Sequence, residues 1–489
     1  MAKHTSDHDS NSYKSILKGT SIFGGVQVFQ ILINIVRGKF VAMFLGPEGM
    51  GIASLFTASS NSIVRFSSLG LNLSFVKEIA SSKDNEDRLV KVAKVAGRLI
   101  QLTGILGALV CALAAPWLSE ISFGSDNYAW QFVILAVAVY LIIAGNGKLA
   151  ILQGLHKVKL LSLASLSGAI SGLLFGVPLY YFFGDKGIVP AIVVLALTTY
   201  IFYWYGLRRT LPKSNVHVSR RFSSIVTRRM ISAGMVLLAS TLINTLCTYA
   251  INIYIRIYGD LSDVGLFNAA NSLTGQYTAV VFTAMALDYF PRLSAVAGDR
   301  LKMRTVVDRQ MEIVAIIAAP LSLLLIITAP IVIRLLLTSQ FLGVTELMRW
   351  LGLAILLKAI AYPLGYIAFA KDNRRLFFWL EAVGCNILYL VCSLAFYFKY
   401  GLMGLGYGAV AEQAACVVLY AIVNFKVYGY LPSRRAWREI VAGILITGLG
   451  FLASLWFQAP AGLIVASVIL VIGGIRAFKV LKRLLNIEN

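Results

Sequence analysis

The sequence has little charge for its length. Only 13% of its 489 residues are charged, and Asp and Glu together number 22. A soluble globular domain carries roughly 25% charged residues. This shortage excludes a soluble enzyme and a disordered chain. The net charge of +22 does not indicate a nucleic-acid-binding protein, because such proteins are rich in charged residues and this chain is not.

Cysteine and histidine are also scarce. The five cysteines all fall within apolar stretches, with no CxxC pair, and the four histidines lie in a polar N-terminal tail and in basic loops. This pattern excludes a disulfide scaffold and a structural zinc site, so we expect no metal and no cofactor. We interpret the cysteines as small buried hydrophobic residues.

Hydrophobic residues, in contrast, make up 58% of the chain. A helix needs about 20 apolar residues to cross a bilayer. Fourteen apolar stretches lie between polar, glycine or proline residues, at 15–45, 49–76, 93–115, 129–153, 160–183, 187–206, 230–258, 265–290, 309–337, 346–370, 375–398, 402–424, 438–457 and 461–478. The first is too long for a signal peptide and lacks a cleavage site. We therefore expect an all-α polytopic membrane protein with about 14 transmembrane helices.

The basic residues indicate how these spans are oriented. Of the 44 Lys and Arg residues, 34 fall on one side of the predicted spans and five on the other. Because loops on the cytoplasmic side are enriched in Lys and Arg, both termini are predicted to be cytoplasmic. The predicted outer loops are short, the longest being about 116–128, and leave no external domain for a catalytic site. An enzyme is therefore not expected.

An internal repeat suggests two lobes. Gly46 and Gly51 match Gly259 and Gly265, and in each copy a long helix is expected to end at a glycine-containing turn before a helix with Ser and Asn returns. We expect an N-lobe at 15–206 and a C-lobe at 230–424, in the same orientation and with a site between them, as in an alternating-access transporter. The other predicted segments are a cytoplasmic tail at 1–14, a basic linker at 207–229, an extra helix pair at 438–478 and a second cytoplasmic tail at 479–489.

The basic linker has an apolar face of its own. Phe222, Ile225, Val226 and Met230 share one side of a helix, which suggests an interfacial amphipathic helix on the anionic inner leaflet. The alternative is a solvated basic loop.

Five cations remain inside the predicted spans: Arg37, Lys39, Arg65, Lys148 and Lys358. A cation in the bilayer core is costly and normally faces a polar cavity or a partner. At about 1.5 Å per residue, all but Lys39 fall near the middle third of the membrane, and Lys39 points away from Arg37. We expect a cavity for an anionic headgroup, because Arg and Lys suit phosphate and pyrophosphate. The alternative is snorkelling, or pairing with a carboxylate of the other lobe.

Acidic residues inside the spans occur only in the second lobe, at Asp288, Glu381 and Glu412. If transport is coupled to an H⁺ or Na⁺ gradient, these are the expected coupling residues, and Glu412 is the best placed to be a buried titrating group. Glu381 and Glu412 have the alternative of pairing with Lys358, and Asp288 has that of ending its helix.

The opening block SILKGTSIFGGVQVFQILINIVRGKFVAMFLGPEGMGIASLFTA resembles the N-terminus of Wzx-type polysaccharide flippases of the multidrug/oligosaccharidyl-lipid/polysaccharide exporter superfamily. The LGPEG turn is the most specific part of the match. The resemblance implies a V-shaped, MATE-like bundle of two six-helix lobes in the bacterial inner membrane. It implies that undecaprenyl-pyrophosphate-linked oligosaccharide is flipped to the periplasmic leaflet for O-antigen or capsule synthesis.

Under this resemblance the cation-lined cavity is supplied by Arg37, Arg65 and Lys148. The expected partners are the lipid-linked oligosaccharide, membrane lipids, and the polysaccharide polymerase with its chain-length machinery. The alternatives are a cation-coupled multidrug exporter, which calls for acids in the cavity, and a lipid II-type flippase, suggested by the extra helix pair. An integral membrane enzyme is a third reading, disfavoured by the short outer loops.

Overall fold

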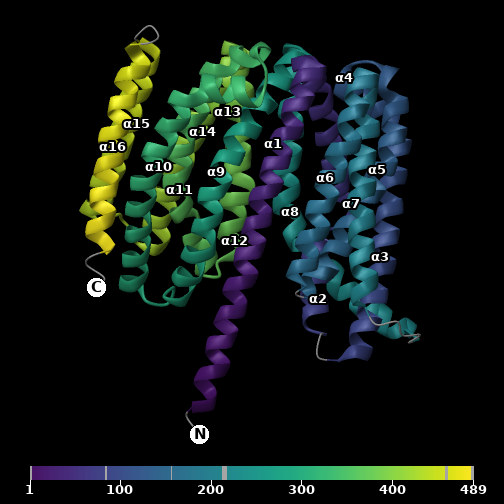
Figure 1. Ribbon diagram of the computed structural model, residues 1–489. Helices are drawn as coiled ribbons and strands as arrows, with labels where there is room; N and C mark the ends of the chain where they lie inside the picture. The colour runs from purple at the N-terminus through teal and green to yellow at the C-terminus, as the bar shows by residue number, and fades with distance from the viewer. Residues whose placement is uncertain (1–2, 83–84, 156, 212–216, 457–460, 486–489) are drawn as a thin grey trace. The chain divides into compact units, whose positions relative to one another are not determined.

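The computed structural model describes residues 3–82, 85–155, 157–211, 217–456 and 461–485 of the chain. Side chains at some positions inside helices, among them residues up to 28 and Asp288, lie outside the described set. The described residues are helical, with no β-strand among them (Figure 1). The all-α prediction is confirmed.

The chain divides into unit 1, Met1–Tyr249, and unit 2, Ala250–Asn489, and the division falls inside one helix, α8. This division does not test the predicted lobe bounds, 15–206 and 230–424, which stay a prediction. The elements of unit 1 are α1 (Lys3–Ser67), α2 (Leu71–Ala80), α3 (Glu86–Leu113), α4 (Ala115–Phe123), η1 (Asp126–Tyr128), α5 (Ala129–Gly154), α6 (Val158–Phe183), η2 (Gly184–Gly187) and α7 (Ile188–Thr210). From α8 (Arg220–Tyr258) the chain continues with α9 (Leu261–Ala295), α10 (Arg300–Leu336), η3 (Ser339–Val344), α11 (Thr345–Ala370), α12 (Arg374–Phe377), η4 (Phe378–Cys385), α13 (Asn386–Tyr400), α14 (Leu402–Tyr428), α15 (Arg434–Trp456) and α16 (Ala461–Leu485).

Each of the fourteen predicted spans overlaps a helix. By length and composition, ten helical stretches of the described residues can cross a membrane, and two of these, Phe29–Ser67 and Leu160–Thr210, each overlap two predicted spans. The physical reason for the agreement is that hydrocarbon leaves no water to satisfy backbone groups, so apolar stretches of this length must be helical. The number fourteen is approximate, but the all-helical polytopic membrane fold is as predicted.

The predicted turn between the first two spans is present. Two helices join within α1 at Gly46, whose φ of 64° and ψ of −167° are non-helical, and Pro47 follows directly. Only glycine adopts such a positive φ without strain. At the matching place in unit 2, α8 ends at Tyr258 and α9 begins at Leu261, with the Asp260 side chain accepting a hydrogen bond from the backbone N–H of Asp263 (2.7 Å).

The second predicted span, 49–76, is not one continuous helix. It breaks after Ser67, where Leu69 and Gly70 both have positive φ, and α2 then begins at Leu71. A Cβ at Gly70 would overlap the backbone carbonyl oxygen of Gly234 on α8. This close contact fixes the first half of α8 to unit 1.

We expect Gly70→Ala to destabilise the protein by about 3 kcal/mol, because the side chain adds left-handed backbone strain and a backbone clash. Thermal unfolding of the purified protein in detergent measures the effect. Gly97→Ala on α3 is the matched control, since a Cβ there meets nothing within 4 Å. It should leave stability unchanged or raise it by about 1 kcal/mol. Equal midpoints for the two variants would contradict the clash.

The predicted linker helix is present, and part of its apolar face is turned toward protein. Val226 and Met230 are buried in a core of unit 1, with Phe222 packed against it. Ile225 on the same helix is 48% exposed, so the interpretation as an interfacial helix stays a prediction. The loop alternative is wrong from Arg220 on, where α8 begins. Periodicity shows that a helix has an apolar face but not whether lipid or protein covers it.

The extra C-terminal pair packs within unit 2, where α15 and α16 lie beside α10 (Figure 1). At one end the buried Glu439 on α15 accepts hydrogen bonds from Arg438 (3.2 Å) and from Arg476 on α16 (2.5 Å). At the other end Arg349 on α11 donates to the backbone oxygen of Ser454 (3.1 Å), where a cation favourably meets a helix C-terminus.

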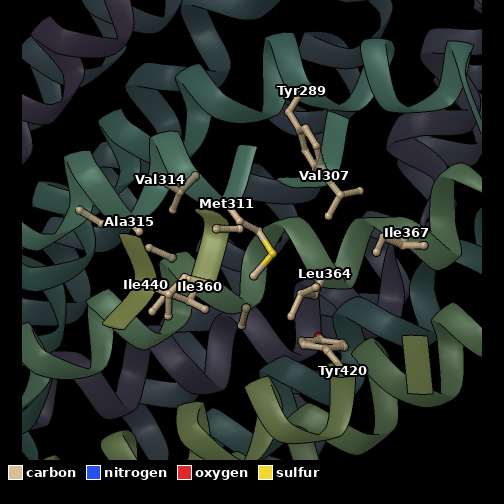
Figure 2. Packing of buried hydrophobic residues seen from close by; sticks show 14 of the residues in the cluster. Tyr289, Val307, Met311, Val314, Ala315, Ile360, Leu364, Ile367, Tyr420 and Ile440 are labelled. Carbon is tan, nitrogen blue, oxygen red and sulfur yellow. The ribbon is translucent and has the colours of Figure 1, made fainter. Parts of the chain in front are cut away.

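The main core of unit 2 joins α9, α10, α11, α14 and α15. Figure 2 shows Met311 at its centre, with Leu364 and Tyr420 next to one another at one side. Tyr430, in the connection after α14, donates to Asp308 on α10 (2.6 Å). Burial and this carboxylate raise the pKa of Tyr430. The core therefore fixes α14 against α11, which positions the polar groups described next.

Candidate functional site

One face of α1 is polar and exposed. Thr57, Asn61 and Arg65 follow one another at a spacing of four residues, and all three are exposed. Residues four apart lie on the same helix face. Ser59 and Ser60 are buried on the other side, where Ser59 hydrogen-bonds to Tyr249 (3.1 Å). A helix in an apolar chain thus presents two hydrogen-bonding groups and a cation together.

Arg65 lies in the last turn of this helix. Its predicted depth assumes one helix over 49–76, whereas α1 ends at Ser67 and α2 begins at Leu71, so the depth of Arg65 stays a prediction. Arg37 and Lys39, earlier on α1, are both half-buried. Arg37 interacts electrostatically with the buried hydroxyl of Tyr180 on α6.

Lys148 occupies a different environment from Arg65. Its side chain is only 8% exposed, and its ammonium lies over the ring of Tyr200 on α7, 4.6 Å from the centroid. No ion pair joins Lys148 to a carboxylate of the described residues. The cation–π contact offsets part of the cost of burying this charge. Among the three predicted N-lobe cations, Arg65 is exposed, Arg37 half-buried and Lys148 buried in its own unit.

In unit 2, Lys358 on α11 is exposed and lies 5.9 Å from the ring centroid of Phe282. It interacts electrostatically with Glu412 on α14, without an ion pair within 4 Å among the described residues. Glu412, which has pairing with Lys358 as its predicted alternative role, is therefore a neighbour of that lysine but forms no ion pair with it among the described residues. Asp288, the third predicted coupling residue, lies in α9 with its side chain outside the described set.

Glu412 is buried, 5% exposed, and both of its carboxyl oxygens have donors. Gln413 Nε2 donates to Oε2 (2.7 Å) and Cys416 Sγ to Oε1 (3.4 Å). Glu381 is exposed and accepts a hydrogen bond from the hydroxyl of Tyr420. It lies in η4, a stretch of π-helix, and π-bulges often occur at functional sites.

Hydroxyl and thiol groups lie between the two glutamates and are hydrogen-bonded to each of them. The Tyr420 hydroxyl, which donates to Glu381, accepts from Cys385 Sγ (3.1 Å). Cys416 donates its one S–H to Glu412, and the Cys385 thiol interacts electrostatically with Cys416. Each of these carboxyl, hydroxyl and thiol groups carries an exchangeable proton or can accept one. A proton that passes between the exposed and the buried carboxyl group along these side chains has to cross from Cys385 to Cys416, which requires the two thiol protons to reorient.

The sequence analysis did not predict that Tyr420, Cys385 and Cys416 lie between the two glutamates. Glu412, Cys416, Tyr420 and Asn424 recur every four residues and are all buried; we call them the α14 stripe. Asn424 continues it by donating to the backbone oxygen of Leu364 (3.0 Å). Cysteine and tyrosine count as apolar in a hydropathy sum, so the signal is visible only as spacing. Among the described residues, no group of three or more His, Cys, Asp or Glu side chains has an arrangement that could hold a metal ion.

Comparison with known proteins gives consistent results. A family described as "Polysaccharide biosynthesis protein" matches residues 40–346. The lipid III flippase of Escherichia coli (strain K12) is 23% identical over 414 residues, 83% of this chain and 97% of that protein. A putative O-antigen transporter of Shigella flexneri is 23% identical over 315 residues, 63% of this chain and 73% of that protein.

Two solved structures have a similar fold. The lipid II flippase MurJ in an inward closed conformation aligns with a TM-score of 0.71 at 14% identity, covering 95% of this chain and 99% of that one. An inward-facing multidrug resistance MATE family transporter of the MOP superfamily aligns with a TM-score of 0.68 at 17% identity, covering 85% and 95%. The fold is that of MATE-like polytopic membrane proteins, as predicted.

Proposed function

The chain belongs to the polysaccharide biosynthesis protein family, and from that premise we propose that it is a flippase for undecaprenyl-pyrophosphate-linked oligosaccharide. It would move these units from the cytoplasmic to the periplasmic leaflet by alternating access, for O-antigen or capsule-type polysaccharide. The relatives carry transport names, lipid III flippase and putative O-antigen transporter, which agrees with a multi-pass inner-membrane transporter rather than an enzyme. A polymerase and its chain-length proteins are proposed partners.

The observation that carries the proposal is the polar face of α1. Arg65 supplies a fork of donors for a pyrophosphate, and Thr57 and Asn61 supply hydrogen-bonding groups for sugars. We propose Arg65 and Arg37 as the primary headgroup contacts, with Lys39, Lys148 and Lys358 adding positive charge. A cationic drug would be repelled by this set, which favours the flippase over a multidrug exporter.

We further propose that transport is coupled to protons through Glu412 and Glu381. The support is the series of hydroxyl and thiol groups that lies between them, together with the donors that occupy both oxygens of Glu412. Hard cations such as Na⁺ take several oxygen ligands, and Glu412 has a nitrogen and a sulfur beside it instead. Asp288 remains a proposed member of the coupling set.

Reconstitution tests the main proposal. Proteoliposomes loaded in one leaflet with a polyprenyl-pyrophosphate-linked oligosaccharide should expose it to an impermeant glycosidase added outside, at a rate that depends on the protein. To test the alternative of a multidrug exporter, the same vesicles carry a labelled cationic dye in place of the lipid. Dye transport without glycolipid transfer would replace the flippase by the exporter. Transfer of lipid II but not of a polysaccharide precursor would favour the lipid II branch.

A further inference from the structure

One end of unit 1 carries six exposed arginines. They lie where α7 ends and α8 begins, and we call them the basic surface: Arg208, Arg209, Arg220, Arg221, Arg228 and Arg229. The sequence contains no Asp or Glu between Asp185 and Asp260, so the segment that bears them has no acidic residue of its own. This concentration of one sign of charge calls for a physical explanation.

The arginines are held on a common base. Leu207 and Leu211 at the end of α7 pack against the same buried cluster as Val218, Val226 and Met230 of the following segment. Both stretches that bear arginines are therefore attached to one hydrophobic core. The basic surface is a fixed feature of unit 1 and not a set of charges on a free loop.

The basic surface has no ion-pair partner among the described residues. No ion pair joins any of its six arginines to an acid of the described residues, whereas two exposed cations of unit 2, Lys302 and Arg374, have such partners. Lys302 lies 3.5 Å from Asp299, and Arg374 lies 2.8 Å from Asp372. The unbalanced charge in unit 1 is available for an anion from outside the protein.

Two of the arginines are combined with aromatic rings. The guanidinium of Arg208 lies 4.2 Å from the Trp204 ring centroid, and that of Arg209 lies 4.3 Å from the Tyr205 ring centroid. Both rings are exposed at the end of an apolar helix. Trp and Tyr at such positions lie at the level of lipid headgroups, and an arginine stacked on them has its donors directed to the same level.

We propose that the basic surface binds the phosphate groups of anionic phospholipids, phosphatidylglycerol and cardiolipin, in the leaflet that meets this end of α7. Arginine forks pair with phosphate oxygens in a bidentate manner, and the aromatic rings place the site at headgroup depth. A nucleic acid or an acidic protein has the charge but not the position, since neither reaches the headgroup layer. The basic surface includes none of the cations proposed to bind the transported lipid.

The test measures lipid preference of the intact protein. The protein is purified in nanodiscs that contain phosphatidylcholine and phosphatidylglycerol, and co-purifying lipid is quantified by mass spectrometry. We expect enrichment of phosphatidylglycerol around the wild-type protein, and a fall of about fivefold in that preference for each arginine removed in Arg220→Gln/Arg221→Gln. Both residues are exposed, so the variant should fold normally, which its thermal unfolding midpoint checks.

Lys302→Gln/Arg374→Gln is the matched control, because it removes two exposed charges that already have acidic partners. It should keep the wild-type lipid preference. An equal loss in both variants would mean that net charge alone attracts the lipid, and an unchanged preference in the arginine variant would also overturn the proposal. So would retention of an acidic protein or RNA by the basic surface with no phosphatidylglycerol enrichment in the wild type.

Discussion

Arg65→Glu should reduce surface polysaccharide by about thirtyfold or more while leaving the amount of folded protein in the membrane unchanged. Removing one partner of a charged contact costs about 2 kcal/mol or more, and charge reversal adds repulsion of the pyrophosphate. The side chain is exposed, so the substitution disturbs no core packing. Complementation of a strain that lacks its own flippase, with immunoblots of protein and glycan, gives both quantities.

The matched control is Arg98→Glu on α3, which makes the same charge change at another exposed position of unit 1. It should complement normally. If both variants fail equally, the effect reflects membrane insertion or net charge, and Arg65 has no specific part in binding the headgroup. Full complementation by Arg65→Glu would remove it from the site.

Lys148 calls for a different substitution because it is buried. Charge reversal there would place an acid beneath Tyr200, and we expect loss of folded protein. Lys148→Met keeps the length of the side chain and removes the charge, so it separates binding from folding. We expect a smaller loss of polysaccharide than for Arg65→Glu, about tenfold or less, because the ammonium is shielded by the Tyr200 ring.

The sequence predicted the helices well for a simple physical reason. A bilayer imposes a length and an apolar composition, so the ends of α5, α6 and α11 fall within about two residues of the predicted spans. The break after Ser67 was not predicted. It depends on Leu69 adopting a positive φ, which leucine rarely does, and on the contact between Gly70 and Gly234, which are distant in sequence.

The site was predicted unevenly for a related reason. A charged residue in an apolar stretch is conspicuous, so Lys148, Lys358 and Glu412 could be found from composition alone. The surroundings of these residues could not be predicted, because burial depends on which helices pack against one another. Tyr200 beneath Lys148 is one such tertiary contact. The α14 stripe was readable in principle from its four-residue spacing, but the π-helical turn that brings Glu381 to Tyr420 was not.

Glu412→Gln should abolish the response of transport to a pH gradient. A gradient of one pH unit supplies about 1.4 kcal/mol per proton, so a transporter coupled to one proton changes its steady-state distribution of glycolipid by up to about tenfold. The glutamine has the same shape and can still bond to Gln413 and Cys416, but it carries no titratable proton. Flipping down the glycolipid gradient alone should persist. Proteoliposomes with and without an imposed pH gradient measure both.

Tyr420→Phe distinguishes a proton path from a single titrating group. The substitution removes only the hydroxyl that joins Glu381 to Cys385, so coupling should slow even though both glutamates remain. Tyr203→Phe is the control, since it also loses a buried hydroxyl, here bonded to Ser165 (2.7 Å), in a helix of unit 1 without such a series of groups. If Glu412→Gln eliminates the pH response and Tyr420→Phe leaves its rate unchanged, protons reach Glu412 by another route. If neither variant changes the pH response, the glutamates hold α14 against α11 and the driving force comes from the glycolipid gradient itself.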